Sequence, residues 1–273
     1  KAPRQIRLVK GSHIIVPKLH NQPEAYILQN EDGRIVFTLP YENDFSIVGT
    51  TDVEYLGKPN EVTISDEEID YLIASSNQYF KQKISREDIV STYSGVRPLM
   101  DDESVDAQKV TRDYTIEENW AQPLAPLMSV FGGKITTYRK LSEKVVDKLH
   151  TRFNQMQSKW TATQPLPGGD FTSKDALENE LSAKFPFLPP ALITRYVRSY
   201  GTLTYKLLGE VQSIKQLGKD FGHGLFEQEV KYLVNNEWAK TIDDILWRRT
   251  KLGLRLNAEQ AKQLEKFLIT LSS

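Results

Sequence analysis

The stretch Ser129–Leu149 combines residue types that can hold an anion. A short apolar run ends at Gly132 and Gly133, and Lys134 and two threonines follow where helical spacing begins. A helix that starts here presents free backbone N–H groups and the positive end of its dipole at one point. That point suits an anion or an electron-rich heteroatom. From the spacing alone, a turn without a ligand fits these residues equally well.

Three other residues could take part in chemistry. His13 follows a Gly-Ser pair between two apolar runs, Arg97 precedes a proline, and Arg112 lies between Thr111 and Asp113. A histidine can accept a proton near neutral pH, and an arginine binds oxyanions with two parallel hydrogen bonds. Taken singly, a structural histidine and two surface or salt-bridged arginines are the simpler interpretation.

The first hundred residues predict a mainly antiparallel sheet. We expect Ile6–Pro17 to form two strands with a turn or bulge at Gly11-Ser12, which places His13 at the break. The pair Asp32-Gly33 separates two apolar runs and predicts a hairpin, because it readily supplies the positive φ of a tight turn. Another strand precedes the turn Gly49–Asp52.

Helices interrupt and follow this sheet. Ser65 and Glu68 form a capping box that opens a helix, and a strand then leads into the segment around Arg97. Composition shifts between Thr151 and Asp170, where Gln, Ser, Thr and Lys dominate, and this predicts a domain boundary.

Beyond the boundary, the sequence predicts helices almost exclusively. Two of them span Ser173–Phe185 and Ala191–Tyr200. A third is capped by Thr241 and Asp244, and a final amphipathic helix begins at Asn257. The expected fold class is therefore α+β with an all-α C-terminal domain. We expect one domain over residues 1–150 and a helical domain over residues 165–273.

Composition excludes several function classes. There is no cysteine, which rules out disulfides, thiolate metal sites and a cysteine nucleophile. The net charge of −1 gives no overall attraction for nucleic acid. Arg248 and Arg249 follow Trp247, but a packed Trp beside surface arginines explains them better than a nucleic-acid contact. No apolar run is long enough to span a bilayer.

Several common motifs are absent. The chain has no G-x-G-x-x-G, no Walker A loop, no G-x-S-x-G elbow and no H-E-x-x-H. None of the four histidines forms a pair with metal-ligand spacing. We therefore expect no metal site and no self-contained nucleotide-binding domain.

A family resemblance does emerge from the order of seven segments. In chain order these are KGSHIIVP, ILQNEDGRIVF, GTTDVEY, YSGVRPL, TRDYT, SVFGGKITTYRK and EWA…DDILWRRTKLGL. The chain resembles, over essentially its whole length, the C-terminal portion of bacterial aerobic FAD-dependent glycerol-3-phosphate dehydrogenases. The resemblance implies an N-terminal Rossmann-like FAD domain, an antiparallel substrate-binding sheet and a helical C-terminal domain. The Gly-rich FAD motif and an early substrate-binding arginine of the family have no counterpart in this sequence.

The resemblance also implies roles for particular residues. His13 and Arg97 match catalytic positions, as proton acceptor and as a cation that holds the developing alkoxide, with the division between them open. Arg112 and Lys134 match substrate-binding positions. The segment beside the flavin comprises Gly132, Gly133, Lys134, Ile135, Thr136 and Thr137.

The implied reaction is oxidation of sn-glycerol 3-phosphate to dihydroxyacetone phosphate, with a hydride passing to FAD and electrons going on to quinone. The resemblance further implies peripheral contact with the inner face of the cytoplasmic membrane and a homodimer. Two alternatives stay open. One is an oxidase of the same family with oxygen as acceptor, and the other is an inert fragment that lacks, or only weakly binds, FAD.

Overall fold

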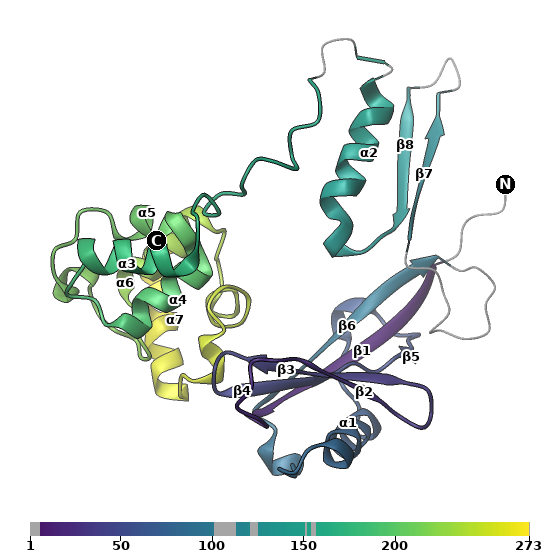
Figure 1. Ribbon diagram of the computed structural model, residues 1–273, viewed down its shortest axis with the longest axis horizontal. Coiled ribbons are helices and arrows are strands. Elements are labelled where there is room, and N and C mark those ends of the chain that lie inside the picture. Colours follow the sequence, from purple (N-terminus) through teal and green to yellow (C-terminus); the bar gives the residue numbers. More distant parts are fainter. Residues whose placement is uncertain (1–5, 101–112, 121–124, 151, 154–156, 273) are drawn as a thin grey trace. The chain divides into compact units, whose positions relative to one another are not determined.

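The computed structural model describes residues 6–100, 113–120, 125–150, 152–153 and 157–272. The chain divides into two compact units, Lys1–Lys159 and Trp160–Ser273. Figure 1 shows strands in the first unit and helices in the second. Each unit has its own hydrophobic core, so each is described by itself.

An antiparallel sheet dominates the first unit (Figure 1). Its six strands are β1 Ile6–Pro17, β2 Tyr26–Gln29, β3 Ile35–Tyr41, β4 Phe45–Gly49, β5 Val53–Glu54 and β6 Ser91–Met100. The long strand β1 is central: β6 pairs along one edge, while β4 and β5 share the other. Beyond β4, strands β3 and β2 form the hairpin that Asp32-Gly33 predicts, and Gly33 has a φ of 79°.

The predicted break near His13 is wrong. Residues Ile6–Pro17 form one uninterrupted strand, because β6 pairs with it without a gap from Ile6 to Ile15. Gly11 lies within this strand rather than in a turn. Its missing side chain makes room for Arg97, since a Cβ at Gly11 would lie 2.4 Å from Nη2 of that arginine. A glycine inside a strand often marks such a close approach.

Helix α1 (Asp66–Tyr79) covers one face of the sheet. Its predicted capping box is confirmed: Ser65 Oγ accepts from Glu68 N at 3.3 Å, and Glu68 Oε2 accepts from Ser65 N at 2.9 Å. Glu68 also pairs with the buried Lys10 at 2.7 Å and accepts from the Ser12 hydroxyl at 2.9 Å. Burial alone would raise the pKa of Glu68, but these hydrogen bonds outweigh it and lower that pKa.

A separate hairpin completes the first unit. Strands β7 (Tyr114–Asn119) and β8 (Leu127–Gly132) pair with each other, and β8 also packs beside β6. A 3₁₀ turn at Ile135–Thr137 then leads into α2 (Tyr138–His150). The predicted order of strand, Gly-Gly turn and helix is confirmed.

The regular secondary structure in the described residues of the second unit is helical, apart from one isolated bridge between Asp220 and Phe226. Its α-helices are α3 Lys174–Lys184, α4 Pro190–Tyr200, α5 Thr204–Leu208, α6 Glu227–Asn236 and α7 Ala258–Ser272. Short 3₁₀ turns join them, and Asp244–Arg249 forms a π-helical turn. The fold class is thus α+β with antiparallel sheets, as expected.

A charged network lies at the centre of this helical core. Arg195 makes two 2.7 Å hydrogen bonds to the carboxylate of Glu229, and the Tyr200 hydroxyl donates to the same carboxylate at 2.6 Å. Glu229 is fully buried, so each polar atom needs such a partner. Among the helices of the described residues, none has the length and apolar character to cross a membrane.

Candidate active site

His13 and Arg97 share the face of the sheet opposite α1. Directly paired residues of antiparallel strands point to the same side, and side chains alternate along each strand. The register pairs His13 with Tyr93, Gly11 with Gly95, and Val9 with Arg97. The alternate residues Ser12 and Ile14 belong to the opposite face, where Ser12 contacts Glu68 of α1. The site therefore lies on the face that α1 leaves uncovered.

The imidazole of His13 lies between Gly49 and Tyr93. It stacks on the Tyr93 ring with centroids 4.5 Å apart and planes within 6° of parallel. On its other side, a Cβ at Gly49 would lie 2.2 Å from His13 Cδ2, so only glycine fits there. His13 Nδ1 is buried with no hydrogen-bond partner among the described residues. The ring is thus fixed by stacking, with one nitrogen unoccupied.

Burial and the charge of Arg97 lower the pKa of His13 to about 4. Both causes act against the imidazolium: burial removes its hydration, and a nearby cation repels it. His13 is therefore neutral at physiological pH, with a lone pair that can accept a proton. A base must be deprotonated before it can act, and this environment keeps His13 so.

Arg97 is fixed by the loop after β4. Its Nη1 donates to Asp52 Oδ1, and its Nη2 donates to Thr50 Oγ1 at 3.1 Å. Both members of the ion pair are less than one-third exposed, so the pair is partly shielded from solvent. The guanidinium presents further N–H donors in a fixed plane, a geometry that matches oxyanions.

Glycines form the floor between the histidine and the arginine. The Arg97 guanidinium lies over Gly11, and a Cβ at Gly95, which pairs with Gly11, would meet nothing within 4 Å. The space above Gly95 is open. A small molecule could therefore rest against backbone on this face, with a neutral base near one end and a cation near the other.

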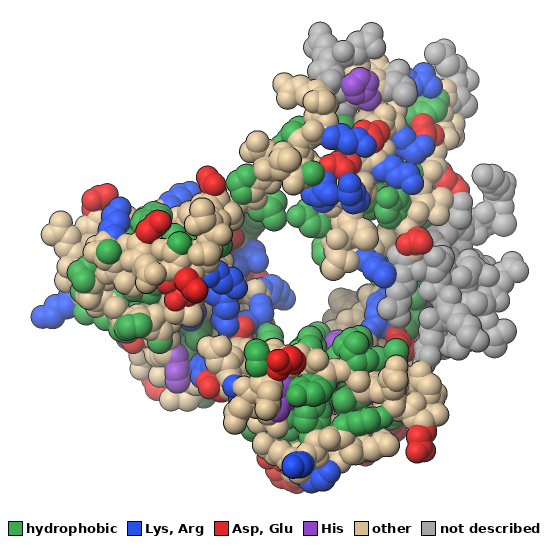
Figure 2. All heavy atoms as spheres, viewed as in Figure 1, with side chains coloured by type: hydrophobic (Ala, Val, Ile, Leu, Met, Phe, Trp, Pro, Cys, Tyr) green, Lys and Arg blue, Asp and Glu red, His purple; other side chains and the backbone are tan. Residues whose placement is uncertain are grey.

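Exposed apolar side chains continue this face across β3 and β2. Ile35, Phe37 and Leu39 of β3 are exposed, and so is Ile27 of β2, which pairs with Phe37. Phe37 also pairs with Gly49, and Gly49 pairs with His13, so all of them share the open face. Figure 2 shows hydrophobic side chains gathered over this sheet.

The Gly-Gly turn lies at the end of β8. Gly132 and Gly133 have φ values of 72° and 99°, a region that favours glycine, and the exposed Lys134 precedes the 3₁₀ turn. The Lys134 carbonyl accepts from the backbone N–H of Thr137 at 3.0 Å and from its hydroxyl at 2.8 Å. Ile135 is 86% exposed beside them. The turn thus presents a cation and an apolar side chain together.

The structure brings two of the sequence-predicted residues, His13 and Arg97, together on the sheet. His13 and Arg97 share one face, and their charges interact. Within the described residues, no hydrogen bond or ion pair joins them to the segment Gly132–Thr137. Arg112 lies outside the described residues. Also within the described part, no cluster of His, Asp or Glu could hold a metal ion.

Sequence reasoning missed the partners of Arg97. Thr50 and Asp52 appear in the sequence only as members of a Gly-Thr-Thr-Asp turn. In the structure, both residues accept hydrogen bonds from the Arg97 guanidinium and hold it in place, although Arg97 lies more than forty residues away in the chain. A carboxylate and a hydroxyl in a turn directly after a buried strand are the signal that could have identified them.

The chain matches two protein-family models. A family model described as FAD dependent oxidoreductase matches residues 1–139. The chain belongs to this family. A second model, described as the C-terminal domain of alpha-glycerophosphate oxidase, matches residues 159–271. The second matched region begins at residue 159, where the chain divides into its two compact units.

Curated relatives match nearly all of the chain. The aerobic glycerol-3-phosphate dehydrogenase of Escherichia coli is 50% identical over 98% of this chain and 54% of that protein. A glycerol-3-phosphate dehydrogenase of Pseudomonas aeruginosa is 48% identical over 98% of the chain and 52% of its own length. The D-erythritol 1-phosphate dehydrogenase of Brucella abortus is 46% identical over 97% and 53%. The chain spans about half the length of the relatives it matches.

A solved structure has the same fold. The glycerol-3-phosphate dehydrogenase of Bacillus halodurans, in complex with FAD, superposes with a TM-score of 0.72 at 22% identity. The match covers 98% of this chain and 57% of that one. The arrangement of strands and helices described above is therefore one that a flavoprotein uses.

The residues at the Gly-Gly turn are compatible with a flavin. Lys134 is exposed and the two glycines keep the backbone free of side chains, so a planar ring can approach the N–H groups at the start of Ile135–Thr137. The exposed Ile135 offers an apolar contact. A cation and helical N–H groups suit the negative charge that a reduced flavin carries.

Proposed function

We propose that this chain forms the substrate-binding and C-terminal part of an FAD-dependent glycerol-3-phosphate dehydrogenase. The reaction is oxidation of sn-glycerol 3-phosphate to dihydroxyacetone phosphate. The observation that carries the proposal is the pairing of a neutral histidine with a fixed arginine on one open, glycine-floored sheet face. The names of the most similar relatives support the substrate.

In this proposal, His13 accepts the proton of the C2 hydroxyl while Arg97 holds the oxygen on which negative charge develops. The C2–H bond breaks with its electron pair, and the C2 carbonyl forms. FAD, when bound, supplies the acceptor for that hydride. Lys134 and the N–H groups at the start of the Ile135–Thr137 turn would hold negative charge beside it, and Arg112 and Lys134 bind the substrate phosphate.

The kinetic test separates chemistry from binding in the full-length enzyme. His13→Ala and Arg97→Ala should each lower kcat by about 10²-fold or more, because each removes an interaction that strengthens in the transition state. Arg112→Ala should mainly raise KM, because the phosphate is bound equally in the ground and transition states. Arg86→Ala, at an exposed ion pair with Asp66 of α1 on the opposite side of the sheet, is the matched control and should leave both constants near their original values. Unchanged kinetics in all three site variants would overturn the assignment.

Retention of FAD by the 273-residue chain is a separate question. We propose that the chain by itself binds FAD weakly or not at all, because the Gly-rich cofactor motif of the family has no counterpart in its sequence. The measurement is a visible absorption spectrum after incubation with FAD and gel filtration. A colourless protein supports the proposal, whereas a retained flavin band would contradict it.

The final electron acceptor is proposed to be quinone. The alternative is oxygen, which the name of the C-terminal family model favours, since it mentions an alpha-glycerophosphate oxidase. Turnover of the full-length enzyme with a soluble quinone under nitrogen, compared with hydrogen peroxide formation in air, distinguishes the two.

We further propose that the full-length enzyme is a homodimer, which light scattering would test. We also propose peripheral contact with the inner face of the cytoplasmic membrane, which sedimentation with membranes would test.

A second candidate substrate is a longer polyol phosphate. It is favoured by the 46% identity to a D-erythritol 1-phosphate dehydrogenase, which is close to the identities with the glycerol-3-phosphate enzymes. The open space above Gly95 does not by itself select three carbons over four. Comparison of kcat/KM for glycerol 3-phosphate and D-erythritol 1-phosphate in the full-length enzyme decides between them.

A further inference from the structure

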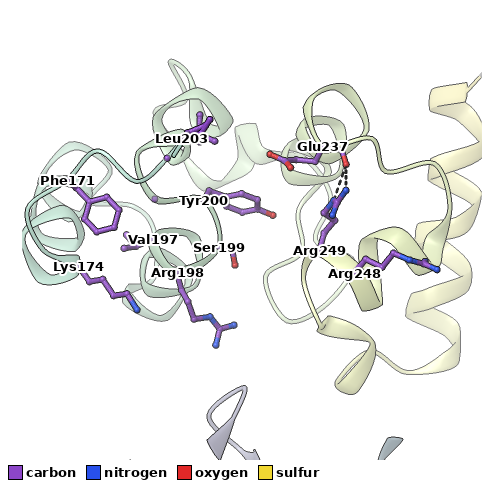
Figure 3. Close-up of a pocket in the computed structure, with 13 residues that line it drawn as sticks. Phe171, Lys174, Val197, Arg198, Ser199, Tyr200, Leu203, Glu237, Arg248 and Arg249 are labelled. Carbon is purple, nitrogen blue, oxygen red and sulfur yellow. Dashed lines mark hydrogen bonds between the residues drawn. The ribbon is translucent and has the colours of Figure 1, made fainter. Parts of the chain in front are cut away.

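The helical unit contains a groove that the proposed reaction does not use. Its lining comes from the loop with Pro167 and Gly168, the start of α3, the C-terminal end of α4 and the residues after it, Glu237 after α6, and the π-helical turn Asp244–Arg249. Its volume is about 450 Å³, which lies in the range of small-molecule sites. Figure 3 shows its walls, with α3 and α4 on one side and the π-helical turn on the other.

Two glycines fix the floor of this groove. Gly168 and Gly201 have φ values of 85° and 53°. A Cβ at Gly201 would lie 1.8 Å from the Gly168 carbonyl oxygen, which accepts a hydrogen bond from Thr202 N at 3.0 Å. The two backbones touch without side chains between them. The groove is therefore part of the folded structure rather than a gap between surface side chains.

Positive charge is concentrated on the walls. Lys174 and Arg198 extend from one wall, and Arg248 and Arg249 come from the other (Figure 3). Among the described residues that line the groove, Glu237 carries the sole carboxylate. The whole chain has a net charge of −1, so this excess of cations is local. Figure 2 shows Lys and Arg side chains clustered on the helical unit.

At least two of these cations keep their charge available. Lys174 has no hydrogen-bond or ion-pair partner among the residues that the structure describes. Arg249 donates through Nε and Nη2 to the backbone carbonyl of Glu237 at 3.0 and 2.7 Å, so a neutral group fixes it. Arg248 pairs with Asp244 at 3.2 Å. A guanidinium that is positioned without being neutralised is suited to recognise an anion.

We propose that this groove binds the dianionic phosphate group of a small organic phosphate. Lys174 and the neutrally held Arg249 can place two positive charges on one ligand, which favours a dianion over a monoanion such as a simple carboxylate. The volume exceeds that of a phosphate group, which leaves room for the organic part beside the hydroxyl of Ser199. The proposal does not depend on the reaction proposed above, because none of the groove residues belongs to the sheet.

The first experiment measures binding of inorganic phosphate to the 273-residue chain by isothermal titration calorimetry at low salt. We expect saturable binding that Lys174→Gln weakens about 10-fold, because the variant removes a charged contact. Lys174 has no partner among the described residues, so this change should leave the fold intact. Arg249→Lys, which retains the charge but loses the fork of N–H groups, should weaken binding less than Arg249→Gln.

Lys206→Gln is the matched control. Lys206 is also exposed, also lies on a helix of the same unit, and does not line the groove. It should bind phosphate like the original chain. Equal loss in Lys206→Gln would show a non-specific charge effect and overturn the proposal. So would binding that survives Lys174→Gln and Arg249→Gln but is lost in Arg97→Gln, because the phosphate would then lie on the sheet.

A phosphate group can come from solution or from a lipid headgroup, and a second experiment separates these sources. The chain is sedimented with phosphatidylcholine vesicles that contain or lack phosphatidic acid. If the chain binds inorganic phosphate in solution but does not sediment with the vesicles, the natural ligand is a free organic phosphate. Vesicle binding that requires phosphatidic acid and is lost in Lys174→Gln identifies a lipid phosphate at the same groove. Absence of both kinds of binding would overturn the proposal.

Discussion

At the scale of single residues, the candidate active site depends on contacts that restrict two side chains. The His13 ring is held between Tyr93 and Gly49, and the Arg97 guanidinium is held by Thr50 and Asp52. Arg97 in turn disfavours the protonated form of His13. A base and a cation that would otherwise move freely are therefore pre-positioned and kept in the charge states that the proposed reaction needs.

The lowered pKa of His13 predicts how stability depends on pH. The unfolded histidine binds a proton below about pH 6.5, whereas the folded one does so only below about pH 4. Between these values the unfolded state holds more protons, so the free energy of unfolding should fall with decreasing pH by up to about 1.4 kcal/mol per unit. Above pH 7, His13 is neutral in both states, so its effect on the free energy of unfolding no longer changes with pH.

Urea unfolding at several pH values between 4 and 7 measures this contribution. The variant His13→Gln cannot titrate in this window, so its stability should fall less steeply than that of the original chain. The carboxylates and the other three histidines are the same in both proteins, so their contributions cancel in the comparison. Identical slopes for the two would show that His13 is not shielded as described.

At the scale of elements, the sheet positions the site through glycines at defined register positions. Gly11 and Gly95 are directly paired between β1 and β6, yet their surroundings differ. A Cβ at Gly11 would lie 2.4 Å from Arg97 Nη2 and 2.6 Å from Thr50 Oγ1. A Cβ at Gly95 would meet nothing within 4 Å. The pair therefore offers a matched test of whether the Arg97 side chain of β6 lies over Gly11 of β1.

Gly11→Ala should destabilise the chain by about 1–3 kcal/mol, because the new methyl group must displace a guanidinium and a hydroxyl that hold each other. Gly95→Ala should have little effect on stability or raise it slightly, because it restricts only the unfolded chain. The free energies of unfolding in urea give both values. A larger loss for Gly95→Ala than for Gly11→Ala would contradict the placement of Arg97.

At the scale of the whole molecule, two separate cores stabilise two units. The sheet unit packs α1 against β1 to β4, whereas the helical unit surrounds the buried pair of Arg195 and Glu229. Removal of one partner from such a pair leaves an uncompensated buried charge and costs about 3–5 kcal/mol. The loss should be confined to the core that contains the pair.

Glu229→Ala should therefore reduce hydrogen-exchange protection in peptides from residues 160–273 and leave those from residues 6–100 unchanged. Glu210→Ala removes an exposed carboxylate from the same unit and serves as the control. It should change protection in neither region. Equal loss of protection in both units after Glu229→Ala would contradict the presence of two separate cores.

The sequence by itself determined the elements whose signals are local. The capping pair Ser65–Glu68 bonds as the spacing predicts, and the final helix begins directly after Asn257 as expected. A strand, the Gly132-Gly133 turn and a helix likewise follow one another in the expected order. Each depends on atoms a few residues apart, so backbone geometry alone brings the partners within reach. The family resemblance rested on similarly compact motifs.

Only the tertiary structure decided which side chains meet. The sequence placed a break at His13, but pairing with β6 over most of the strand's length keeps β1 continuous. It gave no partner for Arg97, because Thr50 and Asp52 reach it only when β1, β6 and the loop after β4 come together. The groove around Lys174 and Arg249 likewise joins segments far apart in the chain. Such contacts depend on strand register and helix packing, which periodicity does not specify.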